Sequence, residues 1–582
     1  MAPQSPFTKI SKRRPPRPPG SAPRVTRYAD LDLLVGDAVQ GHREAAGLGG
    51  LLPGGEGELL AGDLDGHLVA LGADQLGLDT EDGGARVDTP LEGDGAGVQP
   101  AVGGGALGAA PGEHGEAERQ TGEETGGAAD GGHGHGGGLV RHLAKSTRRP
   151  RCHSRSVITR WPDGVAGAPA RVRDMPFDIA RTRAAYPALT EGFVHFDGAG
   201  GTQTAAGVID AVTAAMRMAV GNRSAANVAG RRSLELVAEA RSAVADLLGA
   251  DPAGVVLGPS ATALTYTMAR TLGATWRRGD EVVVSRLDHD ANVRPWVQAA
   301  EAAGATVRWA EIDRQTGELP AAQYADLVGE RTRLVAVTAA SNAIGTMPDV
   351  PAIAKTAHAV GALVYVDGVH SVPHVPTDLT SLGADVLVTS AYKWSGPHLA
   401  AMVADPALWA TLRPAKLLPS SDAVPERFEY GTPSFPLLAG VAAAVDHLAG
   451  LDPDAVGDRR ARLRAGLAAA QAHEEALLDR LLAGLAQRPA ITVYGSPARR
   501  CPTVSFRVAG MSPAAVQEAL GAAGLCLSVG DYYAYEYFHL MGLRDSGGAV
   551  RASIYHYNTA DEVDRLLGEL DALADAAGRM AG

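Results

Sequence analysis

Short apolar runs alternate with longer segments of helical length in the middle of the chain. Four of these runs read DEVVV, LVAVT, ALVYV and ADVLVT, and polar residues follow each of them. This rhythm predicts strands joined by strand–helix–strand crossovers, and hence a parallel sheet. Because open α/β folds bind their ligands where such strands end, the polar residues after the runs are the first candidates for a functional site.

The run ADVLVT continues into SAYKWSGP and places Ser390 and Lys393 at the end of a buried strand. A buried ammonium is costly unless it is partnered, deprotonated or bonded to a carbonyl carbon. A lysine in this setting, after a hydroxyl residue, is therefore typical of a Schiff base with pyridoxal phosphate (PLP). The alternative interpretation is a strand-end lysine whose amine reaches solvent.

Asp367 favours the first interpretation. It follows ALVYV, 26 residues before Lys393, with a spacer of helical length between them. One crossover of that length would bring both residues to the same edge of the sheet. A buried aspartate there can pair with the pyridine nitrogen of the cofactor and keep it protonated, whereas by itself Asp367 could also simply cap a loop.

The two other runs supply an imidazole and an amide. His289 follows DEVVV, and Asn342 follows LVAVT. His289 could lie over the face of the cofactor ring and move protons, and Asn342 could donate a hydrogen bond to the phenolic oxygen. Either residue alone is more common as a structural group with satisfied hydrogen bonds.

Seven pieces of the sequence together resemble the class V aminotransferases and, within them, the cysteine desulfurase-like proteins. They stand in family order over about residues 175 to 582 and read VHFDGAGGTQ, LDHDANVRPW, TAASNAIGT, YVDGVHSVPHVPTDL, SAYKWSGPH, FEYGTPSF and VRASIYHYNTADEVDRLL. The resemblance implies the α/β architecture of a PLP-dependent transferase of fold type I. That fold has a large domain built on a parallel-type sheet and a small α/β C-terminal domain.

On this basis the chain divides into four parts. Residues 1–174 are a low-complexity extension, 175–204 the N-terminal segment of the small domain, 205–434 the large PLP-binding domain and 435–582 the small C-terminal domain. In the last part, three apolar-patterned segments predict helices, and TVSFRVAG predicts a strand between the first and second of them.

The resemblance also implies roles for individual residues. Lys393 matches the lysine that forms the aldimine with PLP, Asp367 the partner of the pyridine nitrogen, and His289 the histidine that stacks on the ring. Asn342 and His370 match positions close to the phenolic oxygen, although the family usually has glutamine where His370 stands. The matches to contacts with the cofactor phosphate are Ser260, Ala261, Thr262, Ser390, Tyr392 and Thr432.

Two of the phosphate matches have further consequences. Ser260, Ala261 and Thr262 open a predicted helix whose unpaired N–H groups favour an anion, although Ser and Thr begin many helices simply as caps. Thr432 resembles the residue that family members lend to the phosphate site of the neighbouring subunit, so the resemblance implies a homodimer. The alternative is that Gly431, Thr432 and Pro433 simply form a turn.

Arg551, in VRASIYHYNT, stands where the family binds the carboxylate of its substrate. A guanidinium is well shaped for a two-pronged contact with a carboxylate, so this residue predicts an amino-acid substrate. The alternative is an arginine in a structural ion pair.

The sequence departs from the desulfurases at the nucleophile. The chain has three cysteines, Cys152, Cys501 and Cys526, and Tyr532 and Tyr533 stand where the family pattern has histidine and cysteine. Sulfur transfer needs an accessible thiolate, so we expect no persulfide by the usual route. Transamination, epimerisation and C–S bond elimination remain open, as does a non-catalytic protein that keeps the fold as a binding module.

Composition limits the other possibilities. The chain has 582 residues, 45% of them apolar, and a net charge of −13, which argues against nucleic acid as the main partner. No apolar stretch approaches the length of a membrane span. Three cysteines without metal-binding spacing suggest a reducing compartment, so we expect a cytoplasmic protein with neither a disulfide framework nor a metal site.

The first 174 residues differ in kind from the rest. A basic, proline-rich opening leads into an acidic, glycine-rich tract with few aromatic residues. Such a composition cannot bury enough apolar surface to offset chain entropy, so we expect disorder. The alternative is that translation begins at Met175, which would leave the upstream tract unexpressed.

Overall fold

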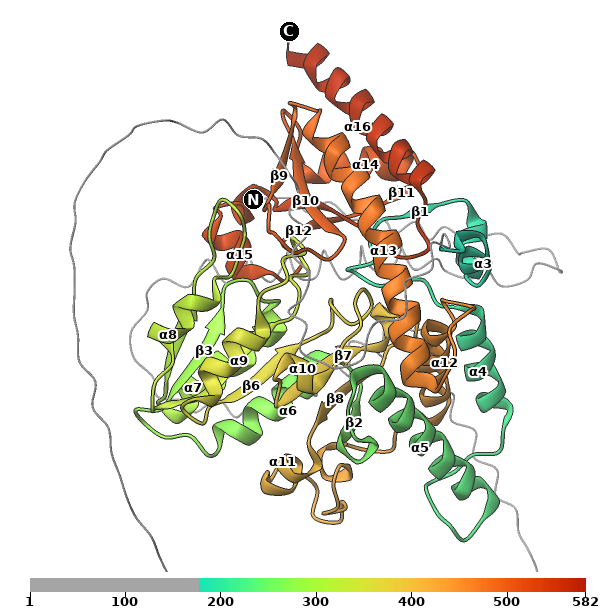
Figure 1. Ribbon diagram of the computed structural model, residues 1–582, viewed down its shortest axis with the longest axis vertical. Helices are drawn as coiled ribbons and strands as arrows, with labels where there is room; N and C mark the ends of the chain where they lie inside the picture. The colour runs from blue at the N-terminus through green and yellow to red at the C-terminus, as the bar shows by residue number, and fades with distance from the viewer. Residues whose placement is uncertain (1–176, 582) are drawn as a thin grey trace, which may run out of the picture. The chain divides into compact units, whose positions relative to one another are not determined.

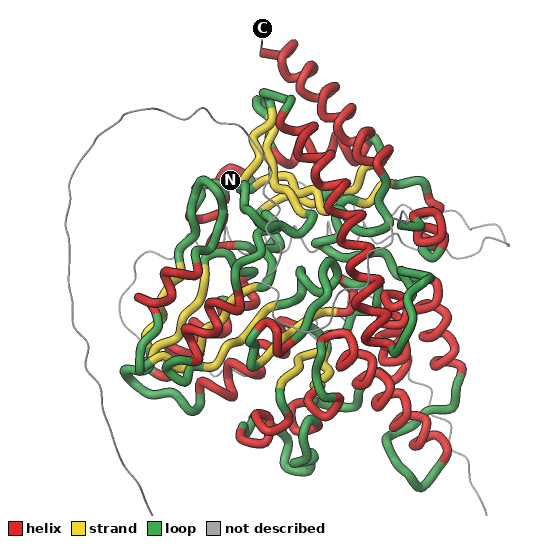
Figure 2. Tube along the Cα trace, viewed as in Figure 1, coloured by secondary structure: helices red, strands yellow, loops and turns green. Residues whose placement is uncertain are grey.

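The computed structural model describes residues 177–581, with side chains described to residue 575. The predictions for residues 1–174 and for a start at Met175 therefore lie outside the described residues. The described part has the α/β architecture that the sequence predicts, with one large sheet, one smaller sheet and a short strand pair. Figure 1 shows the large sheet below and the smaller sheet above it, and Figure 2 separates helices from strands by colour.

The large sheet has seven strands in the order β2-β8-β7-β6-β5-β3-β4. Their bounds in chain order are Val255–Gly258 (β2), Glu281–Ser285 (β3), Thr306–Ala310 (β4), Thr332–Thr338 (β5), Leu363–Asp367 (β6), Val386–Ser390 (β7) and Ala400–Ala404 (β8). The four apolar runs form β3, β5, β6 and β7, which pair parallel to one another as predicted.

The sheet is mixed rather than wholly parallel, because β8 runs antiparallel to both of its neighbours, β2 and β7. The physical reason is the length of the connection. A parallel return needs a crossover of about a dozen residues or more, and only residues 391–399 join β7 to β8. Lys393 lies in this short connection.

Helices cover both faces of the large sheet. Alternate residues of one strand point to opposite faces, so Val283 packs into one hydrophobic cluster and Val282 and Val284 into another. The first cluster includes residues of α5, α9 and α12, and the second includes residues of α6 and α7. The bounds of these helices are Val228–Leu248 (α5), Ala261–Gly273 (α6), Arg294–Ala303 (α7), Val350–His358 (α9) and Phe435–Ala449 (α12).

The crossover from β6 to β7 differs from the expectation of a helix of ordinary length. Its only helix is α10, Leu379–Leu382, which makes a single turn. Other helices of the described part are Ile179–Ala184 (α3), Ala206–Arg217 (α4), Tyr324–Leu327 (α8), Pro406–Thr411 (α11) and Tyr535–Leu540 (α15). Helix α12 packs against α4 and α5, beside the large sheet.

The smaller sheet is antiparallel, with strand order β12-β13-β10-β9. Its strands are Ile491–Tyr494 (β9), Thr503–Val508 (β10), Ser528–Gly530 (β12) and Ala549–Ser553 (β13). It shares a hydrophobic cluster with helices Arg459–Ala486 (α13), Pro513–Ala522 (α14) and Ala560–Ala581 (α16). Near the N-terminal end, β1 (Val194–His195) pairs in parallel with β11 (Leu525–Cys526).

None of the helices within residues 177–581 combines the length and the apolar character needed to cross a membrane. The same residues contain no group of three or more His, Cys, Asp or Glu side chains placed to hold a metal ion.

Candidate active site

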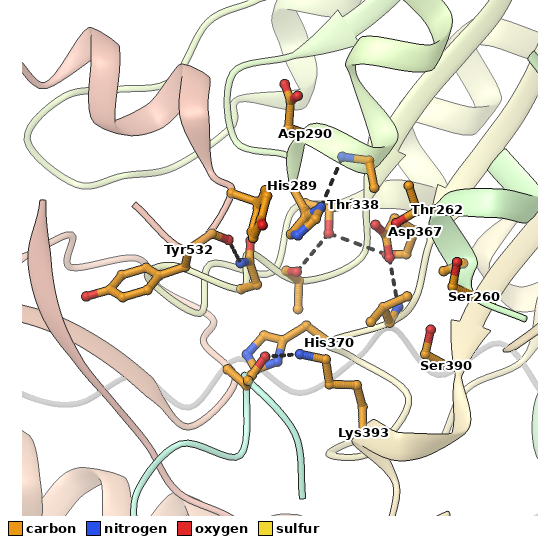
Figure 3. A pocket seen from close by; sticks show the side chains of 18 of the residues that line it. Ser260, Thr262, His289, Asp290, Thr338, Asp367, His370, Ser390, Lys393 and Tyr532 are labelled. Atoms are coloured by element: carbon orange, nitrogen blue, oxygen red, sulfur yellow. Dashed lines mark hydrogen bonds between the residues drawn. The ribbon is translucent and has the colours of Figure 1, made fainter. Parts of the chain in front are cut away.

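A cavity of about 730 Å³ lies where β3, β5, β6 and β7 end, and segments of the smaller sheet close its far side. Eleven of the twelve predicted site residues line it: Ser260, Ala261, Thr262, His289, Asn342, Asp367, His370, Ser390, Tyr392, Lys393 and Arg551. The twelfth, Thr432, is exposed and does not line the cavity. In Figure 3, Ser260, Ser390 and Asp367 lie on one side of the cavity and His289 and Tyr532 on the other.

Lys393 ends a turn of 3-10 helix, Ala391–Lys393, directly after β7. Its side chain is buried, and Nζ donates a hydrogen bond to the carbonyl oxygen of Ala199. Burial, together with the charge of the neighbouring Arg551 guanidinium, lowers the pKa of this amine to about 7, against the opposing charges of Asp367 and Asp197. Near neutral pH a large fraction of the amine is therefore uncharged and nucleophilic.

Asp367 is the last residue of β6 and is buried. One carboxylate oxygen, Oδ1, accepts a hydrogen bond from the backbone N–H of Val369 at 2.8 Å. Burial raises the pKa of the carboxyl to about 6, against that hydrogen bond and the charge of Lys393. A buried carboxylate in this state is stabilised by any further cationic N–H placed beside it.

His289 precedes the short 3-10 helix Asp290–Asn292 and caps it. Its Nδ1 accepts a hydrogen bond from the N–H of Ala291 at 3.0 Å, so the ring proton is on Nε2. Burial and the charge of Lys393 lower the pKa of this histidine to about 4. The imidazole is thus neutral at pH 7, and the ring of Tyr533 stacks on it with 5.5 Å between centroids.

The N-terminus of α6 forms another part of the cavity wall. Ser260 is its N-cap, and Oγ accepts a hydrogen bond from the N–H of Ala263 at 3.1 Å. Ala261 and Thr262, in the first turn, line the cavity. The first turn of a helix leaves N–H groups without helical partners, and these groups attract anions.

Tyr392 and His370 line the cavity together with Lys393. The ring centroid of Tyr392 lies 5.1 Å from Lys393 Nζ, and the ring stacks on His398 with centroids 4.6 Å apart. His370 is buried, and its Nε2 lies 3.0 Å from Thr503 Oγ1. Burial holds the pKa of His370 well below its usual range, so this ring is also neutral.

Arg551, in β13, comes from the smaller sheet and is buried. Its guanidinium donates to the carbonyl oxygen of Asn342 at 2.9 Å and to Ser528 Oγ at 3.1 Å, and it lies 4.4 Å from the ring centroid of Tyr532. Burial lowers its pKa to about 10, so the group stays a cation at neutral pH. No carboxylate is hydrogen-bonded to it in the described part of the chain, which argues against the alternative of a structural ion pair.

Asn342 links the two sides of the cavity. Its Nδ2 donates to the carbonyl oxygen of Tyr532 at 2.8 Å, whereas its Oδ1 is buried and has no partner among the described residues. An amide nitrogen has two N–H groups, so one remains for a further acceptor in the cavity.

Sequence reasoning missed the contribution of the N-terminal segment around Asp197. The Asp197 carboxyl is largely buried, its Oδ1 has no partner in the described part, and burial raises its pKa. Ala199 and Gly200 of the same segment line the cavity. The piece VHFDGAGGTQ carried the family resemblance, but no periodic pattern shows that a two-residue strand brings it beside Lys393.

The loop after β12 carries tyrosines instead of a thiol. Tyr532 and Tyr533 both line the cavity and both have positive φ, 50° and 58°. Neither described cysteine lines the cavity, and burial raises the thiol pKa of both Cys501 and Cys526. A raised pKa lowers the thiolate fraction, so neither thiol suits nucleophilic attack. Cys152 lies outside the described residues.

A family model described as Aminotransferase class-V matches residues 194–566. The chain belongs to the class-V aminotransferase family. It is 38% identical over 400 residues to an uncharacterised protein of Mycobacterium tuberculosis, covering 69% of this chain and 100% of that protein. It is 32% identical to a probable cysteine desulfurase of Pseudomonas aeruginosa, covering 67% of this chain and 96% of the relative.

Solved structures agree with this placement among the cysteine desulfurase-like class-V aminotransferases. An apo cysteine desulfurase from Thermococcus onnurineus NA1 superposes with a TM-score of 0.62 at 26% identity, covering 69% of this chain and 99% of that one. The cysteine desulfurase CsdA of Escherichia coli gives a TM-score of 0.61 at 25% identity, covering 69% and 100%.

The cofactor of this class-V aminotransferase is pyridoxal 5'-phosphate, and the residues present fit it. The cavity offers a buried amine of lowered pKa at Lys393 and a buried carboxylate with a single described hydrogen bond at Asp367. It also offers a helix N-terminus at Ala261 for an anion and an uncommitted amide N–H at Asn342. These are the donor and acceptor types that an aldehyde, a pyridinium, a phosphate and a phenolic oxygen need.

Proposed function

We propose that the protein is a PLP-dependent enzyme that acts on an α-amino acid through Lys393. The observation that carries this proposal is the cavity itself. It brings an amine with a pKa of about 7, a buried carboxylate and a buried guanidinium together from β7, β6 and β13. A non-catalytic binding module would not require a buried arginine without a carboxylate partner at the same cavity.

In this proposal Lys393 would hold the cofactor through its aldehyde carbon, and Asp367 would pair with the pyridine nitrogen. His289 would stack on the ring, and Asn342 and His370 would contact the phenolic oxygen. The groups assigned to the phosphate within the same chain are Ser260, Ala261, Thr262, Ser390 and Tyr392. When bound, PLP supplies an electron sink for the bonds at the substrate's α carbon.

The remaining chemistry belongs to side chains of this protein. Arg551 binds the carboxylate of the substrate with two N–H groups and so fixes which α-carbon bond faces the cofactor. Once the amine of the substrate has replaced it on the cofactor, the freed amine of Lys393 would take the proton from the α carbon and return it, because its lowered pKa keeps the neutral form available near pH 7. The neutral His289 ring covers the site without adding a positive charge.

We propose chemistry at the α and β carbons without a cysteine persulfide. The two described thiols are outside the cavity and have raised pKa values. Transamination, epimerisation and elimination of a β-substituent such as sulfide fit these groups equally, since all begin with removal of the α proton. Product analysis separates them as keto acid, loss of optical activity or released sulfide.

We further propose that the enzyme is a cytoplasmic homodimer. Thr432 is exposed and lies away from the cavity of its own chain, as expected for a residue lent to the phosphate site of a partner. Light scattering with size-exclusion chromatography tests whether the protein is a dimer. The cofactor affinity of Thr432→Ala tests whether Thr432 contributes to the phosphate site of the partner subunit, and we expect that affinity to be lost. A monomer that keeps full cofactor affinity would contradict both.

Titration of the PLP-loaded protein with amino acids tests the proposed function. The visible band of the cofactor should change on addition of a reactive amino acid and should not change with the corresponding amine that lacks a carboxylate. A band that no member of a full amino-acid panel perturbs would contradict the proposal.

A further inference from the structure

The turn that carries Lys393 contains an unusual backbone conformation. Among residues 177–581, only three residues other than glycine have positive φ, and one of them is Ser395, at 65°. It lies two positions after Lys393. A left-handed conformation costs a residue other than glycine about 1 kcal/mol and persists only where the surroundings impose it.

Hydrogen bonds hold Ser395 on both its backbone and its side chain. Its N–H donates to Thr202 Oγ1 at 2.8 Å, and its carbonyl oxygen accepts from the N–H of Ala205 at 3.3 Å. Its Oγ lies 2.8 Å from Tyr186 OH and 3.0 Å from Tyr555 OH. Ser395 is fully buried, so all of these partners belong to the protein.

Tyr186 is the hub of this buried cluster. Its hydroxyl lies 2.8 Å from Ser395 Oγ, 2.8 Å from His447 Nε2 and 2.7 Å from His556 Nε2. A phenol has one O–H to donate and two lone pairs to accept, so three partners use its full capacity. Burial lowers the pKa of both histidines, so both rings are neutral and can offer an N–H or a lone pair.

The cluster joins segments that are far apart in sequence. Tyr186 precedes a 3-10 helix near the N-terminal end of the described chain, His447 is in α12, and Tyr555 and His556 follow β13. On the other flank of the lysine, Thr202 donates to the carbonyl oxygen of Tyr392 from both its backbone N–H, at 3.0 Å, and its hydroxyl, at 3.1 Å. The backbone is thus anchored on both sides of Lys393.

We propose that Tyr186 is a positioning residue that acts through Ser395 to fix the turn bearing Lys393, and so sets where the amine of Lys393 lies in the cavity. This inference rests on the proposed function, in which Lys393 carries the chemistry. None of the cluster residues Tyr186, Ser395, His447 and His556 lines the cavity, so their effect on catalysis must pass through the backbone.

The test compares full-length Tyr186→Phe with Tyr324→Phe. Tyr324 is a buried tyrosine in α8 whose hydroxyl has no hydrogen-bond partner among the described residues and which does not line the cavity. It therefore controls for loss of a buried hydroxyl alone. Each variant is examined for its melting temperature, its kcat and KM, and the pH midpoint at which acetic anhydride acylates Lys393 in the cofactor-free protein.

In Tyr186→Phe the loosened turn should let the amine reach water. We expect the acylation midpoint to rise by about one pH unit, because the desolvation that lowers the pKa is relieved. We expect kcat to fall about tenfold with KM changed less than about twofold, because a misplaced reactive group costs rate more than binding. Tyr324→Phe should leave midpoint and kcat unchanged.

Ser395→Gly and Ser395→Ala provide a second test. Glycine adopts positive φ freely, so Ser395→Gly permits the same left-handed backbone conformation and removes only the hydrogen bonds of the side chain. Both variants should raise the acylation midpoint as Tyr186→Phe does. If Tyr186→Phe does not fold, these two variants test whether the hydrogen bonds of Ser395 position Lys393. An unchanged midpoint and kcat in the folded variants would overturn the proposal, whatever the melting temperature. If borohydride fails to attach PLP to Lys393 in the wild type, the proposed function fails, and the acylation midpoints still test the positioning role.

Discussion

The two walls of the cavity differ in construction. The wall at the ends of β6 and β7 carries Asp367 and Lys393 on hydrogen-bonded strands and their short turns. The opposite wall includes the loop after β12, where Tyr532 and Tyr533 both have positive φ and Tyr533 is 73% exposed. The first wall carries residues that we propose hold the cofactor and is called the cofactor wall below. The second, called the substrate wall, includes Arg551 and has Tyr532 and Tyr533 where the resemblance to the family leads us to expect histidine and cysteine. We infer that the chemistry of the cofactor is retained while the handling of the substrate has changed.

Each wall contains left-handed backbone, a single residue (Ser395) near Lys393 and two consecutive tyrosines in the loop after β12. Two consecutive left-handed residues cost about 1 kcal/mol or more each, and the loop is held by hydrogen bonds from Asn342 to the carbonyl of Tyr532 and from Asp290 to that of Tyr533. The loop therefore has a defined shape against His289 rather than a free end that swings a thiol into the site.

Loss of the amine on the cofactor wall should have the largest effect. In Lys393→Ala we expect turnover to fall at least about a thousandfold, because covalent attachment and the α-proton base are lost together. Steady-state rates at saturating substrate and PLP measure this. Lys416→Ala is the matched control, since Lys416 pairs with Asp422 outside the cavity. If the turnover of Lys393→Ala were within about tenfold of the wild-type turnover, Lys393 would not be a catalytic residue.

On the substrate wall, Arg551→Lys should lower kcat/KM for the amino acid about a hundredfold, because a lysine cannot reproduce the two-pronged contact with a carboxylate. The preference for the amino acid over the amine without a carboxylate should shrink by a similar factor. Arg480→Lys, which alters an exposed pair with Asp564 outside the cavity, should change neither value. Unchanged preference in Arg551→Lys would place the substrate carboxylate elsewhere.

The pH dependence of cofactor attachment should report the burial of Lys393. Only the neutral amine attacks an aldehyde, and its fraction rises as the pH increases through the pKa, which burial lowers to about 7. The rate at which PLP attaches to the apoprotein should therefore rise with pH and level off above about pH 8. Stopped-flow absorbance measures this rate. A midpoint near that of an ordinary exposed lysine would show that Arg551 and burial do not act on the amine as described.

The smallest effect is expected at the thiols. Cys526→Ser should keep kcat within about twofold of wild type, because this thiol lies outside the cavity and has a raised pKa. No persulfide should form on the protein when cysteine is supplied, as judged by intact-protein mass. Loss of activity together with loss of a persulfide in Cys526→Ser would restore the desulfurase mechanism.

The sequence predicted the cofactor wall well for a physical reason. Its residues follow continuous apolar runs, and parallel strands bring their ends to one edge, so the sequence alone places His289, Asn342, Asp367 and Lys393 together. The four predicted strands pair in parallel as expected, whereas β8 was not predicted, and its antiparallel direction follows from the short connection after β7.

The substrate wall and the anchor of Lys393 could not be predicted in the same way. Asp197, Tyr186 and His447 meet the site or its supporting turn through contacts between distant segments. A two-residue strand and a single left-handed serine leave no periodic signal in the sequence. The family resemblance supplied Arg551, and only the structure shows that its guanidinium lacks a carboxylate partner among the described residues.

Borohydride reduction of the PLP-loaded protein, followed by peptide mass spectrometry, tests the central claim most directly. Reduction should fix the cofactor to one tryptic peptide, with the added mass on Lys393, and prior removal of PLP should abolish the label. A reduced protein that carries the cofactor on another lysine, or carries none, would contradict the account.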